Sequence, residues 1–267
     1  MRHSITLIGC GKMGGAMMRS WLDNDLVESI DIIDPSPLSS ELMNDSRISY
    51  AAKYGGEEIT SDILILAIKP QILKDASAEI AKNLSDNTVL LSIAAGQSLA
   101  TLENIFGSDK AIIRTMPNTP ASIGKGISVC VANSHVNDKQ KNIAQNLLDA
   151  TGKNLWVEDE SLMDAVTALS GSGPAYIFYL IEALANAGEK LGLSKEMSIT
   201  LARQTVIGSA ALAEQEPNTS AATLRKNVTS PKGTTEAALN VLMDGRFQDI
   251  LNEALSAAKS RGGELNK

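Results

Sequence analysis

Apolar runs alternate with helical stretches over the first part of the chain. The runs that we interpret as strands are Ser4–Ile8, Ser29–Ile33, Asp62–Ile68, Thr88–Ala94, Ala111–Thr115, Gly126–Ala132 and Leu155–Val157. The stretches between them with a helical period include Lys12–Asn24, Gln71–Leu84 and Asn137–Thr151. Strands that are apolar nearly throughout and alternate with helices are typical of a parallel sheet covered on both faces. The pattern therefore predicts an α/β domain.

The pattern changes near Asp159. Beyond this point no run is typical of a strand, and Ala- and Leu-rich helical stretches are separated by SGSGP, KLGLS, EQEPNTS and TSPKG. We place a domain boundary here, which gives an α/β domain over residues 1–159 and an all-α domain over residues 160–267.

The helix expected after Pro174 is apolar on nearly every face, from Tyr176 to Ala185. A surface helix normally has a single apolar stripe. A segment of about a hundred residues is too small to bury several such helices well by itself. The helix belongs either to a tight internal core or to a surface that a second subunit completes, and we expect the second subunit.

The first strand and the first helix are joined by glycines at the spacing G-x-G-x-x-G, namely Gly9, Gly11 and Gly14. Glycines at these positions permit a tight turn, close approach of a pyrophosphate and close helix–strand packing. The start of the helix adds free N–H groups and the positive end of its dipole. The motif predicts a dinucleotide site that includes Lys12 and Met13, whereas the alternative is a glycine-rich turn without a ligand.

Asp34 lies at the end of the second strand, twenty residues beyond Gly14. A carboxylate here accepts a hydrogen bond from the 2′-hydroxyl of the adenosine ribose and repels a 2′-phosphate. No arginine follows closely, although Ser36 and nearby backbone groups remain candidates for holding a phosphate. Taken alone, Asp34 favours NADH over NADPH.

The ends of other strands are candidate parts of the same dinucleotide site, because open parallel sheets bind ligands in a crevice beyond the carboxyl ends of their strands. Lys69 either contacts a ribose or phosphate or is a solvated lysine. Asn118 either orients the nicotinamide carboxamide or caps a turn. The residues that we assign to the cofactor from these ends are Ala67, Lys69, Pro70, Ala94, Ala95 and Asn118.

Composition and charge narrow the class of partner. The 267 residues are 43% hydrophobic and 21% charged, which is typical of a globular protein. A net charge of −7 and only 3% aromatic residues argue against nucleic acid as the main partner.

Cys10 and Cys130 lie in apolar runs and are expected to be free thiols. Without a leader-like or membrane-spanning segment, we expect a soluble, cytoplasmic protein, and we predict no metal site.

One ordered set of motifs runs through the chain, namely GCGKMG, AIKP, SIAAG, RTMPNTPA, DAVTALSGSGPAY and SPKGTTEAAL. This set resembles the pyrroline-5-carboxylate reductase family across essentially the whole chain. The resemblance implies an NAD(P)H-dependent enzyme of proline biosynthesis. It also implies a Rossmann-type dinucleotide-binding domain, followed by a helical domain that interlocks with a partner subunit in dimers, often assembled further into decamers.

The resemblance also implies the substrate site. The substrate is a five-membered cyclic imine with a carboxylate, and SPKGTT forms a turn before a helix over Thr234–Met243. The family's substrate-binding positions fall on Glu160, Asn227, Ser230, Gly233, Thr234 and Thr235. Thr235 is expected near the imine nitrogen. An imine can enter already protonated, so a hydroxyl donor is enough and neither His3 nor His135 is required. Ser and Thr are also common N-caps, and we expect the loop to be a cap as well as a site.

Two positions depart from the family pattern. Lys232 stands where a second glycine is usual. If the backbone there needs a positive φ, a lysine costs energy or shifts the loop; alternatively, its cation attracts the substrate carboxylate. Asp34 stands where many members have Ser, Asn or Thr, which puts the usual preference for NADPH in doubt. The alternatives to the predicted activity are reduction of a related cyclic imine, such as the six-membered homologue, and a non-catalytic nucleotide-binding regulatory protein.

Overall fold

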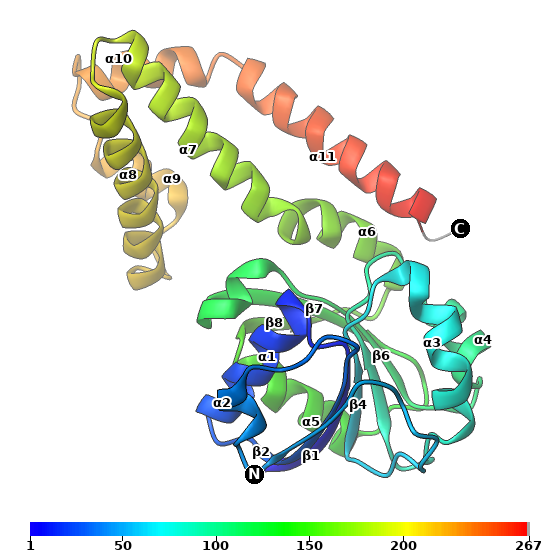
Figure 1. The fold of residues 1–267 in the computed structure, drawn as a ribbon. Helices are drawn as coiled ribbons and strands as arrows, with labels where there is room; N and C mark the ends of the chain where they lie inside the picture. Colours follow the sequence, from blue (N-terminus) through cyan, green and yellow to red (C-terminus); the bar gives the residue numbers. More distant parts are fainter. Residues whose placement is uncertain (266–267) are drawn as a thin grey trace. The chain divides into compact units, whose positions relative to one another are not determined.

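The computed structural model describes residues 1–265, except for the side chains of Lys74 and Asp75, and it divides into two compact units. Unit 1 comprises Met1–Ser172 and the C-terminal residues from Ala258 onward, and unit 2 comprises Gly173–Ala257. Unit 1 contains a predominantly parallel sheet and unit 2 is helical (Figure 1), which confirms the predicted fold class. The boundary expected after residue 159 remains a prediction about domain organisation.

Unit 1 is built on one eight-stranded sheet with the strand order β3-β2-β1-β4-β5-β6-β7-β8. Its strands are β1 (His3–Ile8), β2 (Val27–Ile33), β3 (Ile48–Ala51), β4 (Ile63–Leu66), β5 (Val89–Ser92), β6 (Ile112–Met116), β7 (Gly126–Ala132) and β8 (Gly152–Trp156). All neighbouring pairs are parallel except β6 and β7. The order therefore reverses between β1 and β4, the place where such sheets bind ligands.

The antiparallel step from β6 to β7 differs from the all-parallel sheet that the apolar pattern predicts. Residues 117–125 join the two strands and contain only the 3₁₀ helix η1 (Thr119–Ile123). A parallel connection needs a crossover of about a dozen residues or more, so this short link returns the chain in the opposite direction.

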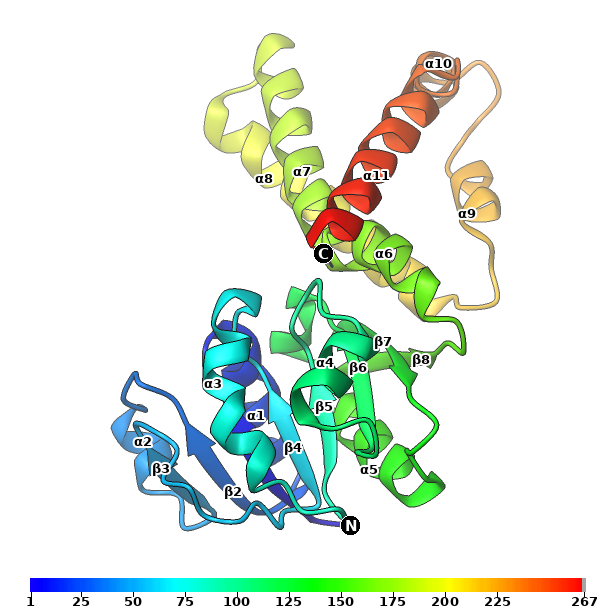
Figure 2. The same cartoon turned by 90° about the vertical axis from the view of Figure 1, so that its right-hand side faces the viewer.

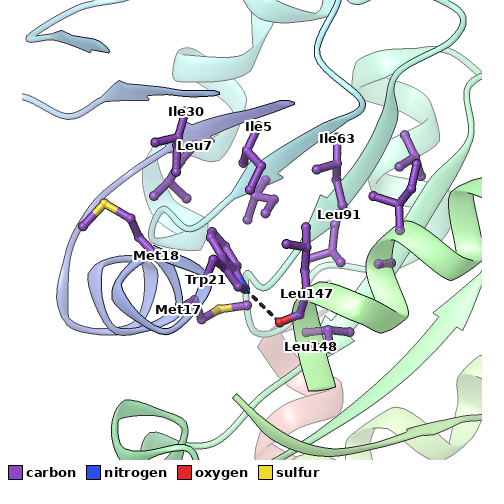
Figure 3. Close-up of a cluster of buried hydrophobic side chains, with 14 of the residues drawn as sticks. Ile5, Leu7, Met17, Met18, Trp21, Ile30, Ile63, Leu91, Leu147 and Leu148 are labelled. Carbon is purple, nitrogen blue, oxygen red and sulfur yellow. Dashed lines mark hydrogen bonds between the residues drawn. The ribbon is translucent and has the colours of Figure 1, made fainter. Parts of the chain in front are cut away.

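Helices cover both faces of the sheet, as predicted (Figures 1 and 2). The helices of this part are α1 (Lys12–Asp23), α2 (Ser40–Met43), α3 (Pro70–Lys82), α4 (Leu99–Phe106) and α5 (Asp138–Asp149). One core packs α1 and α5 on the sheet, and Figure 3 shows the indole N–H of buried Trp21 donating to the carbonyl of Leu147 at 2.8 Å. The other core packs α3 and α4 on the opposite face.

A run of short helical segments follows the last strand. It consists of η2 (Glu160–Leu162), α6 (Met163–Val166) and the π-helix η3 (Thr167–Gly171). The π-helix lies within the predicted motif DAVTALSGSGPAY, and its wider turn is closed by the Ser172 N–H on the carbonyl of Thr167 at 2.9 Å. Single π-turns of this kind often occur at functional sites.

Unit 2 is a small helical assembly. Its helices are α7 (Gly173–Lys190), α8 (Lys195–Gln215), α9 (Ala221–Asn227), α10 (Thr234–Leu242) and the first part of α11 (Arg246–Leu265). The helices α7 and α8 approach closely at Gly188, where a Cβ atom would lie 2.9 Å from Ser198 Oγ. Among the helices of the described chain, none combines the length and the hydropathy needed to cross a membrane.

Large apolar side chains of unit 2 remain exposed. Phe178 and Tyr179 on α7 are 61% and 71% exposed, and Val241 and Leu242 on α10 are also exposed. A single copy of unit 2 therefore leaves apolar surface uncovered well beyond what isolated surface residues produce. This arrangement agrees with the expectation that a second subunit completes the helical domain.

Candidate functional site

The glycine turn between β1 and α1 is fixed by close backbone contacts. Gly9 has φ +93°, and a Cβ atom there would lie 2.6 Å from the carbonyl oxygen of Ala67. At Gly14, a Cβ atom would lie 2.3 Å from the carbonyl oxygen of Gly9. These two glycines are therefore required by the protein's own packing, as the motif predicts.

Gly11 has a different reason to be glycine. Its φ of −69° is open to any residue, and a Cβ atom there would meet no atom within 4 Å. It is also the N-cap of α1, with no side chain accepting the N–H groups of the first turn. An open surface of backbone donors at a helix N-terminus fits the pyrophosphate of a dinucleotide.

The carboxylate of Asp34 links this turn to the end of β2. One carboxylate oxygen accepts a hydrogen bond from the Cys10 N–H at 2.6 Å, and the other accepts from the Ser36 N–H at 2.7 Å. A carboxylate has about four acceptor sites, so both oxygens can still accept from a ribose hydroxyl. The N–H of Ser36, by contrast, already has an acceptor.

A crevice of about 840 Å³ extends over the carboxyl ends of β1, β2 and β4. The predicted cofactor residues that line it are Gly9, Gly11, Lys12, Met13, Asp34, Ser36, Ala67 and Lys69. Lys53, Tyr54 and Glu79 line it as well and were not predicted. Lys53 was missed because it follows β3, a short edge strand without an apolar run to mark it in the sequence.

A smaller recess of about 230 Å³ lies beside this crevice and shares Met13, Ala67 and Lys69 with it. The ends of β5 and β6 contribute its other walls, through Ala94 and Ala95 and through Met116 and Pro117. Small side chains at these strand ends leave room for a flat ring against the backbone, as we expected for Ala94 and Ala95.

Three residues assigned to the cofactor, Gly14, Pro70 and Asn118, lie outside the walls of both cavities. Pro70 is the first residue of α3, where its missing N–H costs no hydrogen bond. The side-chain oxygen of Asn118 accepts from the Ile127 N–H at 2.9 Å, and its NH₂ group donates to the carbonyl of Ser170 at 3.2 Å. The amide of Asn118 thus ties β7 to the π-helix, which neither expected role described. Asn118 is the N-cap residue of η1, but its side chain makes no capping hydrogen bond there, and its contact with the nicotinamide remains a prediction.

Glu160 is held inside unit 1 by two partners. Its Oε1 accepts from the Arg114 guanidinium at 2.7 Å and from the Leu99 N–H at 2.8 Å. Arg114 is only 5% exposed, so its charge needs this partner. The sequence did not predict this ion pair, which joins β6 to η2, while the bond from the Leu99 N–H joins η2 to the start of α4. A substrate contact of Glu160 remains a prediction.

The SPKGTT segment forms a tight turn into α10 in unit 2. The Gly233 N–H donates to the carbonyl of Ser230 at 3.0 Å, with Pro231 and Lys232 between them. A Cβ atom on Gly233 would lie 2.5 Å from Ser230 Oγ and 3.0 Å from the Ser230 carbonyl oxygen, so a larger residue would require the Ser230 side chain to move. The helix begins at Thr234, as predicted, and ends at Leu242, one residue before the predicted end.

The expectation that Ser or Thr hydroxyls cap this helix is wrong. The N-cap is Gly233, which offers no side chain. Within the described chain, the hydroxyls of Ser230, Thr234 and Thr235 make no hydrogen bond, and neither do the N–H groups of Thr234 and Thr235. The cap is absent because the turn places glycine at the position that a capping hydroxyl would take, which leaves a group of free donors at a helix N-terminus.

Lys232 has φ +57°, in the left-handed region that favours glycine. The departure from the family pattern therefore does place a side chain on a strained backbone position. The Lys232 N–H donates to a carboxylate oxygen of Glu236 at 2.7 Å, and Glu236 is the third residue of α10. This backbone bond holds the turn in place.

Asn227, the last expected substrate residue, ends α9 only a few residues before the turn. The structure thus brings Asn227 and the turn into one unit and the dinucleotide residues into the other.

Neither cysteine thiol is a candidate nucleophile. Burial and the neighbouring Asp34 carboxylate raise the pKa of Cys10, and burial raises the pKa of Cys130 to about 12. Both are unpaired, as expected. Among the described residues, no three His, Cys, Asp or Glu side chains gather in a metal-binding arrangement.

Comparison with known families gives two matches. Residues 160–265 match the family described as pyrroline-5-carboxylate reductase dimerisation, and residues 4–96 match the family described as NADP oxidoreductase coenzyme F420-dependent. The first match begins at η2 and includes all of unit 2, and the second covers β1 to β5.

Individual proteins agree with these matches over most or all of the chain. A pyrroline-5-carboxylate reductase from Pseudomonas aeruginosa is 45% identical over 77% of this chain and 75% of its own. The structure of one from Coxiella burnetii superposes with a TM-score of 0.92 at 36% identity, with 100% of both chains covered. The Plasmodium falciparum enzyme with NADP bound gives a TM-score of 0.82 at 29% identity, covering 99% of this chain and 98% of that one.

Proposed function

Because the chain belongs to the pyrroline-5-carboxylate reductase family, we propose that unit 1 binds the dinucleotide and that the N-terminus of α10 binds the substrate carboxylate. The reaction is the reduction of 1-pyrroline-5-carboxylate to proline by a nicotinamide dinucleotide, the last step of proline biosynthesis. The observation that supports the assignment of the substrate residues is the group of free hydroxyls and N–H groups at the start of α10.

The crevice of unit 1 fits a dinucleotide, because the glycine turn leaves open backbone donors at Gly11 and the walls continue along the strand ends. When bound, the cofactor supplies the hydride that is added to the imine carbon. Gly11, Lys12 and Met13 would hold the pyrophosphate, Asp34 the adenosine ribose, and Ala94 and Ala95 the nicotinamide side.

The turn before α10 suits a carboxylate. The N–H groups of Thr234 and Thr235 have no acceptor in the described chain, and Ser230 adds a hydroxyl beside them. Anions are stabilised at helix N-termini by such donors and by the helix dipole, by about 0.3–1 kcal/mol when exposed and more in a closed site. Gly233 adds no side-chain atom of its own to the approach to these donors.

Thr235 is the residue that we assign to the reacting nitrogen. A protonated imine needs no proton from the enzyme, because its nitrogen keeps its hydrogen when the carbon is reduced. The hydroxyl of Thr235, which has no partner in the described chain, then orients the nitrogen and stabilises the developing amine. Asn227 and Glu160 complete the proposed set of substrate residues.

For the cofactor we propose a preference for NADH. Asp34 retains acceptor sites for a ribose 2′-hydroxyl, and the Ser36 N–H is already engaged by that carboxylate, so it is not available to a phosphate. Two like charges about 4 Å apart repel by about 1 kcal/mol in water and by more in a partly closed site. The opposing argument against a preference for NADH is that members of the family usually prefer NADPH.

We further propose that unit 2 forms the dimer and that the enzyme works in the cytoplasm. The dimerisation match over residues 160–265 and the exposed apolar side chains of α7 support self-association. The two unpaired thiols fit a reducing compartment. Assembly of dimers into decamers is the finer prediction, and the mass of the purified protein in solution tests it.

Turnover of racemic 1-pyrroline-5-carboxylate with NADH, and separately with NADPH, tests the proposed function. We expect proline as the product and a higher kcat/KM with NADH. The six-membered homologue is the comparison substrate, since one methylene changes binding by about 1–3 kcal/mol. Dinucleotide binding without turnover of either imine would support the regulatory alternative and contradict our proposal.

A further inference from the structure

We propose that Lys53 is a specificity-determining residue, which binds the 2′-phosphate of NADPH and keeps this cofactor usable beside the carboxylate of Asp34. The inference rests on the proposed function, since it concerns the same dinucleotide crevice. It explains how a chain with an acid at the end of β2 can still accept the phosphorylated cofactor.

The pairing of β2 with β3 sets the position of Lys53. Ile33 pairs with Ala51 at the ends of these parallel strands, and the next residue, Asp34, donates its N–H to the carbonyl of Ala51 at 3.2 Å. The hydroxyl of Tyr50 donates to the carbonyl of Asp34 at 3.0 Å, which is a second bond between the two strand ends. Lys53 lies only two residues beyond Ala51, so it leaves β3 beside Asp34.

Three lysines line the crevice, and they occupy different sides of it. Lys12 opens α1, where the pyrophosphate binds, and Lys69 follows β4, which lies beyond β1 as seen from β2. Among the described residues that line the crevice, Lys53 is the cation on the side of β2 and β3. An acid at the end of the second strand recognises the adenosine ribose, so the 2′-position lies on this side.

The ammonium of Lys53 is available for a ligand. In the described part of the chain it makes neither an ion pair nor a hydrogen bond, and the side chain is exposed. The neighbouring backbone donor, the N–H of Ser36, is taken by Asp34. A 2′-phosphate that enters this corner meets the Asp34 carboxylate, so it needs an opposite charge nearby, and Lys53 provides one.

The test compares nucleotides that differ only by the phosphate. Dissociation constants are measured for NADPH and NADH, and for 2′,5′-ADP and 5′-AMP, on the wild-type protein, Lys53→Met and Lys53→Arg. Lys82→Met is the matched control, because Lys82 is an exposed lysine at the end of α3 that does not line the crevice. We expect Lys53→Met to weaken NADPH and 2′,5′-ADP about tenfold while NADH and 5′-AMP change less than twofold.

The remaining results separate this proposal from the proposed function. Lys53→Arg should keep NADPH binding, and the salt dependence of NADPH binding should fall in Lys53→Met only. An unchanged ratio of NADPH to NADH affinity in Lys53→Met would overturn the inference, as would an equal loss of both cofactors or a wild-type protein that binds only NADH. A wild-type protein that binds neither dinucleotide would instead overturn the proposed function.

Discussion

At the scale of single residues, Thr235 carries the hydroxyl that the proposed mechanism assigns to the reacting nitrogen. We predict that Thr235→Val lowers kcat for imine reduction about 10²-fold, because a preorganised donor acts in the transition state. The affinity for NADH should stay nearly unchanged, since Thr235 belongs to unit 2 and the glycine turn to unit 1. Steady-state kinetics combined with NADH titration measures both quantities.

Thr229→Val is the matched control for this variant. Thr229 lies just before the turn, and its hydroxyl is already occupied by donation to the carbonyl of Arg225 at 2.6 Å. Its loss should reduce stability by about 1 kcal/mol and leave kcat close to that of the wild-type protein. Wild-type kinetics in Thr235→Val would remove Thr235 from the mechanism.

Asp34 is the second residue with a distinct expected effect. We predict that Asp34→Ser narrows or reverses the ratio of kcat/KM between NADH and NADPH, because it removes both a ribose acceptor and a charge that repels the 2′-phosphate. Both cofactors should lose some affinity, since Asp34 also holds the N–H groups of Cys10 and Ser36.

Asp34→Asn separates these two effects, because it removes the charge and keeps one acceptor oxygen. It should shift the ratio toward NADPH while disturbing the glycine turn less than serine does. A wild-type enzyme that clearly prefers NADPH would contradict the argument from Asp34 and leave the reductase assignment intact.

Site residues were predictable where the chemistry depends on local spacing. Gly9, Gly14 and Asp34 are fixed by the geometry of one β–α–β unit, so the motif alone located them. The ion pair of Arg114 with Glu160 joins residues 46 positions apart, and only the folded sheet shows that they meet. Sequence reasoning therefore assigned Glu160 to the substrate without finding the partners that hold it.

At the scale of elements, the turn before α10 stores backbone strain at Lys232. A non-glycine residue in the left-handed region costs roughly 1–2 kcal/mol, and Lys232 has φ +57°. We predict that Lys232→Gly raises the free energy of unfolding by about 1 kcal/mol or leaves it unchanged, since glycine also gains entropy in the unfolded chain. Chemical denaturation at fixed protein concentration measures this.

Lys232→Ala is the companion variant, because it removes the cation and keeps a Cβ atom on the strained position. If the cation attracts the substrate carboxylate, both variants should raise KM for the imine by a similar factor, and only the glycine variant should relieve strain. A KM that rises in neither variant would mean that Lys232 has no part in substrate binding.

The elements themselves were predictable to the extent that burial marks them in the sequence. Strands buried on both faces form continuous apolar runs, and each of these was found. The edge strand β3 (Ile48–Ala51) was missed, because it has no fully buried residue and no apolar run. The direction of β7 was not predictable either, because an apolar run has the same pattern in a parallel and in an antiparallel strand.

At the scale of the whole molecule, the exposed apolar side chains of α7 indicate where a second copy packs. We predict that Phe178→Asp gives smaller species than the wild-type protein in light scattering. Burying a phenylalanine contributes about 1.5–3 kcal/mol, and in a symmetric dimer the loss occurs twice. The dissociation constant of the dimer should therefore rise by at least about a hundredfold. Phe178 tests the interface more directly than the half-buried Ile181, because a charge at Ile181 would also disturb the fold of one subunit.

The control for this prediction is Lys190→Asp, which introduces the same side chain, with a larger change in charge, at the exposed C-terminal end of the same helix. We expect Lys190→Asp to keep the mass of the wild-type assembly, and circular dichroism should show that Phe178→Asp retains its helices. If larger assemblies are built from dimers, Phe178→Asp should remove these as well, because their building block is lost. A well-folded Phe178→Asp protein with the mass of the wild-type assembly would mean that this face of α7 is not a subunit interface. The dimerisation assignment of residues 160–265 would then have to rest on other exposed side chains, such as those of α10.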